Sequence, residues 1–216
     1  SEMCIRDRYV DARMSDGTLL ARLTVHVVDH YDYEDSAGRP YTGLYQQQDG
    51  QWIYVKNGSW AYDHTGFVVK DGDWWYVENG RITFHCNGLV KGLVNGNDTW
   101  WYVTGSKVNF CNTVASNAYG WWKITNGQVD FGYVGYEQNG SNWWYVYGGQ
   151  VCFQATDVLP GTVGGQYGWW KVCEGKVNFD DDVCENAYGW WKITTGKVDF
   201  QYTGLAQNAC GWWMIQ

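Results

Sequence analysis

Apolar and polar residues alternate in a short pattern that recurs along most of the chain. Residues 74–84, WWYVENGRITF, show it in full. An Asn-Gly pair between two alternating runs is a strong signal for a β-hairpin, because a type I′ turn needs positive φ at both central positions. With Asn79-Gly80 at the turn, Val77 pairs with Ile82. Each copy of the pattern therefore predicts one β-hairpin.

The alternation gives each hairpin an apolar face and a mixed face. Trp75, Val77, Ile82 and Phe84 lie on the apolar face, which we expect to form the core together with the same positions of the other hairpins. The mixed face starts with Trp in all eight copies and continues two residues later with Tyr or Lys in seven of them. The function of the repeats is therefore sought on the mixed face.

Lysines on the mixed face are expected to form cross-strand ion pairs. The register places Asp130 opposite Lys123 and Asp199 opposite Lys192. Such a pair contributes about 0.2–1 kcal/mol, and a slip of one residue would destroy it.

The hairpins form a tandem repeat of about 23 residues with a longer super-period. Trp doublets or their equivalents begin at Trp52, Trp74, Trp100, Trp121, Trp143, Trp169, Trp190 and Trp212. Successive doublets are separated by a middle (22), a long (26) and a short (21) spacing, which recur in that order. Every doublet therefore returns after a super-period of about 69 residues, and residues 117–131 reappear nearly unchanged as 186–200.

A fixed period of this size indicates a solenoid or array. The predicted fold is an all-β solenoid of stacked β-hairpins, joined by Gly-, Asn- and Asp-rich connectors such as 89–99 and 115–120.

Three regions are expected along the chain. Residues 1–8 resemble a translated sequencing-library adapter, since TCG GAG ATG TGT ATA AGA GAC followed by AG encodes SEMCIRDR; this implies assembled environmental DNA and a missing true start. Residues 9–50 are a degenerate cap or the tail of a preceding domain, with a strand or two in 19–29. Residues 51–216 are the repeats, and 212–216 read as the first strand of a hairpin truncated at the C-terminus.

Composition narrows the class of protein. The 216 residues include 16 Trp, 17 Tyr and 7 Phe, which argues against disorder, and no apolar run is long enough for a membrane-spanning helix. A net charge of −8 argues against nucleic acid as a partner.

The segments WWYVENG, GWWKI and YTGLAQNACGWW resemble the tandem Trp-rich repeats of surface proteins of anaerobic gut Firmicutes. More distantly, they are similar to the cell-wall-binding repeats of choline-binding and glucan-binding proteins. The resemblance covers about Tyr41–Gln216 and implies a left-handed superhelix with about three hairpins per turn. The chain departs from that family in its Trp-Trp-Tyr/Lys strand and in lacking Gly-x-Met after the turn, which leaves choline open as the ligand.

Ligand binding is expected at the mixed-face aromatic residues of the Tyr-bearing repeats. Sugar rings stack on Trp and Tyr, and quaternary ammonium groups bind aromatic cages at roughly 0.5–2 kcal/mol per ring. Repetition along a polymer would add avidity. The first Trp of each hairpin could instead pack between hairpins, and Tyr119, Tyr167 and Tyr188 could wall grooves or fill connectors. The candidate residues are Trp52, Tyr54, Trp74, Tyr76, Trp100, Tyr102, Trp143 and Tyr145.

No catalytic, metal or cofactor site is predicted. The cysteines do not recur with the repeat, which favours free thiols over a disulfide framework. A cluster of possible metal ligands is interpreted as a solvated strand and loop: His26, Asp29, His30, Asp32, Glu34 and Asp35. No nucleophile elbow or P-loop is present, so the chain is not expected to be an enzyme.

These features predict a non-catalytic module that binds cell-wall or surface polysaccharide, with choline-like groups as one candidate contact, on a secreted or surface-attached bacterial protein. Net acidity favours a neutral or cationic group on the ligand. Two alternatives stay open: a structural stalk without ligand, and the targeting region of a wall hydrolase whose catalytic domain lies outside these residues. The sequence leaves the oligomeric state open.

Overall fold

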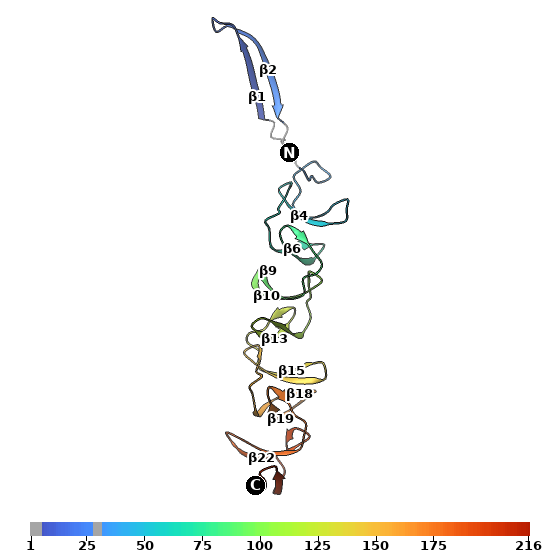
Figure 1. The fold of residues 1–216 in the computed structure, drawn as a ribbon, viewed down its shortest axis with the longest axis vertical. Coiled ribbons are helices and arrows are strands. Elements are labelled where there is room, and N and C mark those ends of the chain that lie inside the picture. Colours follow the sequence, from blue (N-terminus) through green and yellow to red (C-terminus); the bar gives the residue numbers. More distant parts are fainter. Residues whose placement is uncertain (1–5, 28–31) are drawn as a thin grey trace. The chain divides into compact units, whose positions relative to one another are not determined.

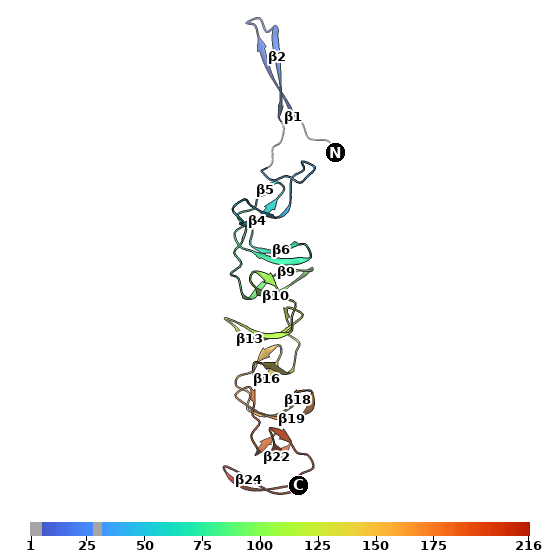
Figure 2. The same cartoon turned by 90° about the vertical axis from the view of Figure 1, so that its right-hand side faces the viewer.

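The computed structural model describes residues 6–27 and 32–216, and every regular element in them is a β-strand (Figures 1 and 2). The prediction of an all-β fold is confirmed. These residues divide into two compact units: the first comprises the described residues up to His64 with Asn79–Arg81, and the second comprises Thr65–Glu78 with Ile82–Gln216.

The first unit contains two separate groups of strands. Strands β1 (Arg6–Arg13) and β2 (Leu19–Val27) form an antiparallel hairpin, as expected for the alternating segment 19–29. Strands β3 (Gly43–Gln46), β4 (Trp52–Lys56) and β5 (Ser59–Trp60) pair in that order. The described end of the adapter-like segment, residues 6–8, lies in β1 opposite residues 25–27.

The second unit repeats a motif of three strands, here called the first strand, the Trp-Trp strand and the return strand. In one repeat these are β12 (Thr113–Asn117), β13 (Gly120–Thr125) and β14 (Gln128–Val129). The hairpin between β12 and β13 is longer than the predicted one between β13 and β14. The segments expected to be connectors, 89–99 and 115–120, therefore belong largely to this additional hairpin.

The other repeats have the same order of strands. They are β6 (Gly66–Lys70), β7 (Asp73–Val77) and β8 (Arg81–Ile82); β9 (Gly88–Val94), β10 (Asn97–Thr104) and β11 (Lys107–Val108); β15 (Gly135–Asn139), β16 (Asn142–Tyr147) and β17 (Gln150–Val151); β18 (Asp157–Val163), β19 (Gln166–Cys173) and β20 (Lys176–Val177); β21 (Asp182–Asn186), β22 (Gly189–Thr194) and β23 (Lys197–Val198); and finally β24 (Gly204–Asn208) with β25 (Gly211–Ile215).

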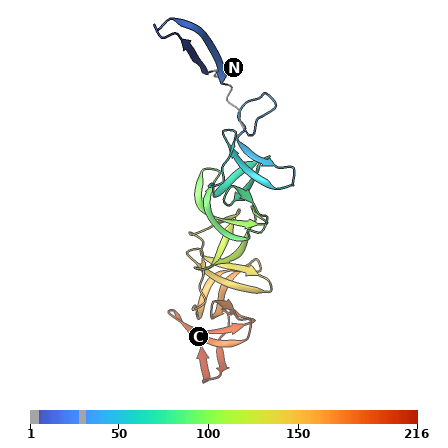
Figure 3. The same ribbon diagram turned by 45° about the horizontal axis from the view of Figure 1, so that its top comes forward.

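Each return strand also pairs back with the Trp-Trp strand of the preceding repeat. Examples are Gln150 with Trp122 and Lys176 with Trp144. These pairings join β6, β7 and β9 to β23 into one hydrogen-bonded network. Figures 1 and 3 show the hairpins of this unit following one another in sequence order, so the predicted solenoid of stacked hairpins is confirmed.

The hairpins of this unit point in different directions around the stack. In Figure 1 the hairpin of β15 and β16 points to the right, whereas that of β21 and β22, two repeats later, points to the left. In Figure 2 the hairpins of β12–β13 and β24–β25, four repeats apart, point to the same side. Successive repeats are therefore rotated relative to one another.

The predicted register between the Trp-Trp strand and the return strand is confirmed. Ile124 pairs with Val129, and Val146 with Val151. Both central residues of the turn have positive φ, for example 48° at Asn126 and 78° at Gly127, as a type I′ turn requires. The paired aliphatic residues are buried in repeat after repeat and form a series of small core clusters along the unit.

The Phe at the end of the apolar face lies outside this core, contrary to the sequence prediction. The return strand is only two residues long, so the chain leaves the ladder before it reaches the Phe. Exposed fractions of this side chain are 47% for Phe84, 43% for Phe110, 52% for Phe131, 40% for Phe153, 45% for Phe179 and 53% for Phe200.

A backbone clasp holds each repeat against the next. In this clasp the second turn residue of one repeat lies between two backbone groups of the preceding repeat. The Gly149 amide donates to the Tyr133 carbonyl, and the Gly149 carbonyl accepts from the Lys123 amide, at 2.9 and 2.8 Å. Gly127 and Gly175 make the same two bonds in their repeats. The clasp satisfies backbone groups that would otherwise be buried without partners.

Only very small residues fit at the clasp position, which is the second residue of the turn. Gly149 has a φ of 78°, and a Cβ there would collide with the carbonyl oxygen of Asp130. Ser106 occupies this position in one repeat, fully buried at φ 65°, and its hydroxyl accepts a bond from the Cys86 amide. Both backbone conformation and space therefore restrict this position.

We predict that Gly149→Ala lowers the free energy of unfolding by about 2 kcal/mol or more, since it adds a steric clash to the roughly 1–2 kcal/mol cost of a left-handed conformation. Gly140→Ala is the matched control, because Gly140 has a φ of 63° and nothing within 4 Å of a new Cβ. Urea unfolding followed by Trp fluorescence measures both. Equal losses in the two variants would contradict the clasp.

Candidate ligand-binding site

An asparagine at the end of the first strand fixes the second Trp of three repeats. In the repeat of β13, Asn117 Oδ1 accepts hydrogen bonds from the Tyr119 amide at 2.9 Å and from Trp122 Nε1 at 3.1 Å. The same pair of bonds forms at Asn186 and at Asn208. One side chain thus sets both the turn and the orientation of the indole ring.

Four aromatic rings surround a cavity between this repeat and the preceding one. Trp100 comes from β10, Tyr119 from the turn after β12, Trp122 from β13, and Phe131 from the segment after β14. Together with Lys91, Asn117 and Val129 they line about 390 Å³. The Trp100 and Tyr119 rings lie 6.1 Å apart in an edge-to-face arrangement. Tyr119 is 72% exposed, so the cavity opens to solvent on that side.

The same four aromatic positions meet again one super-period later, at Trp169, Tyr188, Trp191 and Phe200. Trp169 lies 5.2 Å from Tyr188, 6.0 Å from Trp191 and 6.1 Å from Phe200. We refer to the two sets as the Tyr119 cage and the Tyr188 cage. Both occur where the spacing between Trp doublets is the short one.

The two cages differ at one cross-strand position. Lys91 is the neighbour of Trp100 on the adjacent strand, and Pro160 is the neighbour of Trp169. The Tyr119 cage therefore carries a cation at its edge that the Tyr188 cage lacks.

The long spacing between doublets buries the second Trp. Trp101 is 2% exposed and Trp170 is 5% exposed, and each donates its Nε1–H to a glycine carbonyl of its own, longer hairpin. The first Trp of the preceding repeat packs against the buried cluster that contains each of them, Trp74 for Trp101 and Trp143 for Trp170. No room for a ligand is left around these two indoles.

The middle spacing lets the rings pack against each other. Trp121, Trp144 and Phe153 lie within 5.5–5.8 Å of one another, with Ser141 at the position that Tyr119 occupies. Trp190 stacks on Trp213 at 3.9 Å, with Cys210 at that position. The Trp and Phe rings at Trp121 thus meet much as they do in the Tyr188 cage, but no Tyr forms an outer wall.

The residues predicted from sequence are therefore placed in different surroundings. Trp100 lines the Tyr119 cage, and Tyr102 lines a second cavity together with Trp121. Tyr76 packs on Phe67, and Tyr145 packs on the buried Tyr136. In the first unit Tyr54 contacts His64, and Trp52 is half-buried in β4.

Sequence reasoning placed Trp122 and Phe131 in the core and left Tyr119 with two readings. It also gave Lys91 no role. The signal that separates Trp122 from the buried Trp101 is the spacing of the doublets combined with Asn five residues before the second Trp.

The predicted ion pairs of Lys123 with Asp130 and of Lys192 with Asp199 do not form in the described part of the chain. Lys123 pairs with Glu137 and Lys171 with Asp182, in each case on the first strand of the next repeat. The backbone register is as expected, because the Asp130 amide donates to the Lys123 carbonyl. Asp130 instead accepts from the Thr125 hydroxyl.

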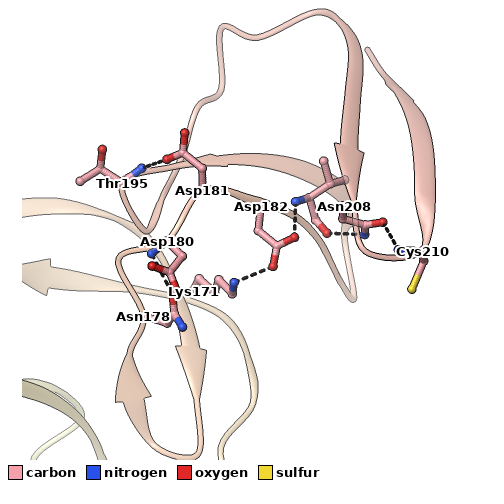
Figure 4. Close-up of polar contacts among 9 residues, drawn as sticks. Lys171, Asn178, Asp180, Asp181, Asp182, Thr195, Asn208 and Cys210 are labelled. Atoms are coloured by element: carbon pink, nitrogen blue, oxygen red, sulfur yellow. Dashed lines mark hydrogen bonds and ion pairs between the residues drawn. The ribbon is translucent and has the colours of Figure 1, made fainter.

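Lys171 and Asp182 form the pair shown in Figure 4, at 2.5 Å. Burial acts to lower the pKa of Lys171, but the hydrogen bond and charge of Asp182 outweigh it and raise this pKa above its ordinary 10.5. Burial acts to raise the pKa of Asp182, but Lys171 and the Val183 amide lower it below 3.8. The pair thus stabilises the contact between two repeats while both groups are charged.

The described residues contain no disulfide, no group of metal ligands and no helix that could cross a membrane. Their six cysteines are free, and burial raises the pKa of Cys184 to about 11. Within residues 6–27 and 32–216 no three His, Cys, Asp or Glu side chains come together as metal ligands. Asp29 and His30, from the polar cluster noted in the sequence, lie outside the described residues. None of the described segments is a helix long and apolar enough to cross a membrane.

One protein-family model matches segments of this chain. The model of the choline-binding repeat matches residues 41–59, 63–83, 88–109, 112–130 and 201–215. Solved structures that match include choline binding protein F from Streptococcus pneumoniae, at 16% identity and a TM-score of 0.34, covering 99% of this chain and 72% of that one. No curated protein matches the chain.

We predict that Asp182→Asn lowers the free energy of unfolding at pH 7 by about 1–2 kcal/mol, because it leaves Lys171 without its charged partner. The contribution of Asp182 exists above its ordinary pKa of 3.8 and is lost as the pH falls through its lowered value in the folded state. The contribution of Lys171 is lost as the pH rises above 10.5.

Urea unfolding of wild type and variant at pH 7 and near pH 2 measures this difference. Asp181→Asn serves as control, since Asp181 is exposed and its Oδ1 accepts from the Thr195 amide, which an Asn can also do (Figure 4). A difference between Asp182→Asn and wild type that persists undiminished at pH 2 would contradict the account.

Proposed function

Because the tandem hairpins of this chain are choline-binding-like repeats, we propose that it is a non-catalytic module that binds cell-wall or surface polysaccharide. In this proposal the module holds a secreted bacterial protein at the cell surface. The Tyr119 and Tyr188 cages bind quaternary ammonium groups, such as choline, carried by the polymer.

The observation that carries the proposal is the recurrence of one four-ring arrangement in two places. A cation over aromatic faces gains roughly 0.5–2 kcal/mol per ring, and Trp is the strongest of these rings. Each cage contributes two indoles, one phenol and one phenyl ring. The family match includes Trp100, Tyr119 and Trp122, and the internal repeat extends the same positions to Trp169, Tyr188 and Trp191.

Two cages on one chain suit a polymer better than a free small molecule. The outer wall of each cage is an exposed Tyr, 72% for Tyr119 and 77% for Tyr188, so weak binding of a single group is expected. A polymer that occupies both sites gains avidity, because the second contact is intramolecular. The net charge of −8 further favours a cationic group over an anionic one.

We predict that choline quenches or shifts the Trp fluorescence of the wild-type protein with a saturable, millimolar dissociation constant. Tyr119→Ala combined with Tyr188→Ala should weaken this binding about tenfold, because each cage loses one wall. Tyr167→Ala is the matched control: Tyr167 is 70% exposed at the same hairpin position, but the adjacent Trp170 is buried. No response to choline or to choline-bearing teichoic acid would favour the structural stalk instead.

Because Lys91 lies beside only the Tyr119 cage, we predict that the two cages bind choline with unequal affinities. In the Tyr119 cage the Lys91 ammonium repels a bound cation, so Lys91→Ala should raise the affinity of that cage for choline about two- to fivefold at low salt. Pro160→Lys should lower the affinity of the Tyr188 cage. Titrations in the Tyr188→Ala and Tyr119→Ala backgrounds isolate each site, and an effect independent of salt would argue against electrostatic repulsion.

A further inference from the structure

A second cavity lies outside the two cages and has a different character. It occupies about 420 Å³ between the repeats of β10, β13 and β16, and its walls include Trp121, Tyr102, Asn87, Ser116 and Asn139. Backbone and small aliphatic side chains of the first strands complete it. None of its lining residues is charged.

Several polar groups at this cavity have no partner in the described part of the protein. The hydrogen bonds there include none to the Tyr102 hydroxyl, the Ser116 hydroxyl or the Asn139 side-chain amide. Asn87 is different, because its amide is held by the Gly105 amide and the His85 carbonyl. Two hydroxyls and one amide thus remain available beside the half-buried face of Trp121.

Equivalent positions in other repeats are filled. One super-period later, Lys171 replaces Tyr102 and pairs with Asp182, while Glu185 replaces Ser116. Lys123 occupies the same strand position in the next repeat and pairs with Glu137. The open cavity at Tyr102 is therefore a local feature rather than a general consequence of the fold.

Cross-strand neighbours explain why Tyr102 is left available. Tyr76 and Tyr145 face the aromatic rings of Phe67 and Tyr136 across their hairpins and pack on them. Tyr102 faces Leu89, which has no ring to stack on it.

We propose that this cavity binds one neutral hexopyranose unit of the wall or surface polysaccharide. An indole face matches the apolar face of a pyranose ring, and hydroxyl and amide groups match its equatorial hydroxyls. The absence of charged lining residues disfavours sugars that carry carboxylate or phosphate. The inference rests on the proposed function, and it adds a sugar subsite next to the sites for the cationic group.

The test uses the full chain with chitotriose and isomaltotriose as probes. Isothermal titration and the indole N–H signals in two-dimensional NMR follow binding, with the Trp121 signal assigned from Trp121→Phe. We expect saturable binding of at least one neutral trisaccharide, with the Trp121 signal shifted most. Tyr102→Phe, which removes the hydroxyl alone, should weaken binding about three- to tenfold.

Two variants serve as controls. Tyr145→Phe alters the same strand position where the ring is already packed, and Tyr119→Ala alters a cage. Neither should change sugar binding. Choline binding without a response to either sugar would overturn this inference and leave the proposed function standing, whereas no response to choline or sugar would overturn both. Sugar binding that is lost with Tyr119→Ala but kept with Tyr102→Phe would place the sugar in the cage and overturn the inference.

Discussion

The backbone clasp between successive repeats is the constraint on which the other features depend. A single turn residue supplies both an amide and a carbonyl to the repeat before it, and it does so with positive φ and in a confined space. This requirement restricts the position to Gly, or to Ser106 in one repeat. The clasp brings the return strand against the preceding Trp-Trp strand, and the first Trp of one repeat thereby reaches the second Trp of the next.

With the stacking of repeats fixed, the length of each hairpin decides what the two indoles do. In a repeat with the long spacing, a glycine carbonyl accepts a hydrogen bond from the indole N–H of the second Trp. Trp101 and Trp170 are buried in this way. The middle spacing lets rings stack, as Trp190 does on Trp213. Only the short spacing combines an Asn that fixes the second indole with a Tyr that forms an outer wall. The super-period is therefore an ordered series of one sealed, one open and one stacked arrangement.

Much of this fold could be predicted from local pattern. The Asn-Gly turns and the pairing of Ile124 with Val129 follow from period-two alternation, which acts between residues close in sequence. The first strands were missed although Asn95-Gly96 carries the same turn signal, because other turns of this hairpin, such as Ala118-Tyr119, carry none. The partner of Lys171 was missed for another reason. Asp182 belongs to the next repeat, and the sequence of one strand does not predict how neighbouring repeats stack.

The candidate site was only partly predictable for the same reason. Trp100 and Tyr102 are neighbours on one face of one strand, yet they line different cavities, since each meets a different part of the next repeat. Trp122 and Phe131 share a face with buried aliphatic residues, and only the short length of β14 turns Phe131 outward. Identifying a cage requires knowing which repeats touch.

The most direct test of this account is a choline titration observed at every indole N–H by two-dimensional NMR. The account predicts that the signals of Trp100, Trp122, Trp169 and Trp191 shift together and saturate, while those of Trp101 and Trp170 stay in place. Shifts at the buried indoles alone, or shifts of equal size at all of them, would contradict the assignment of the cages.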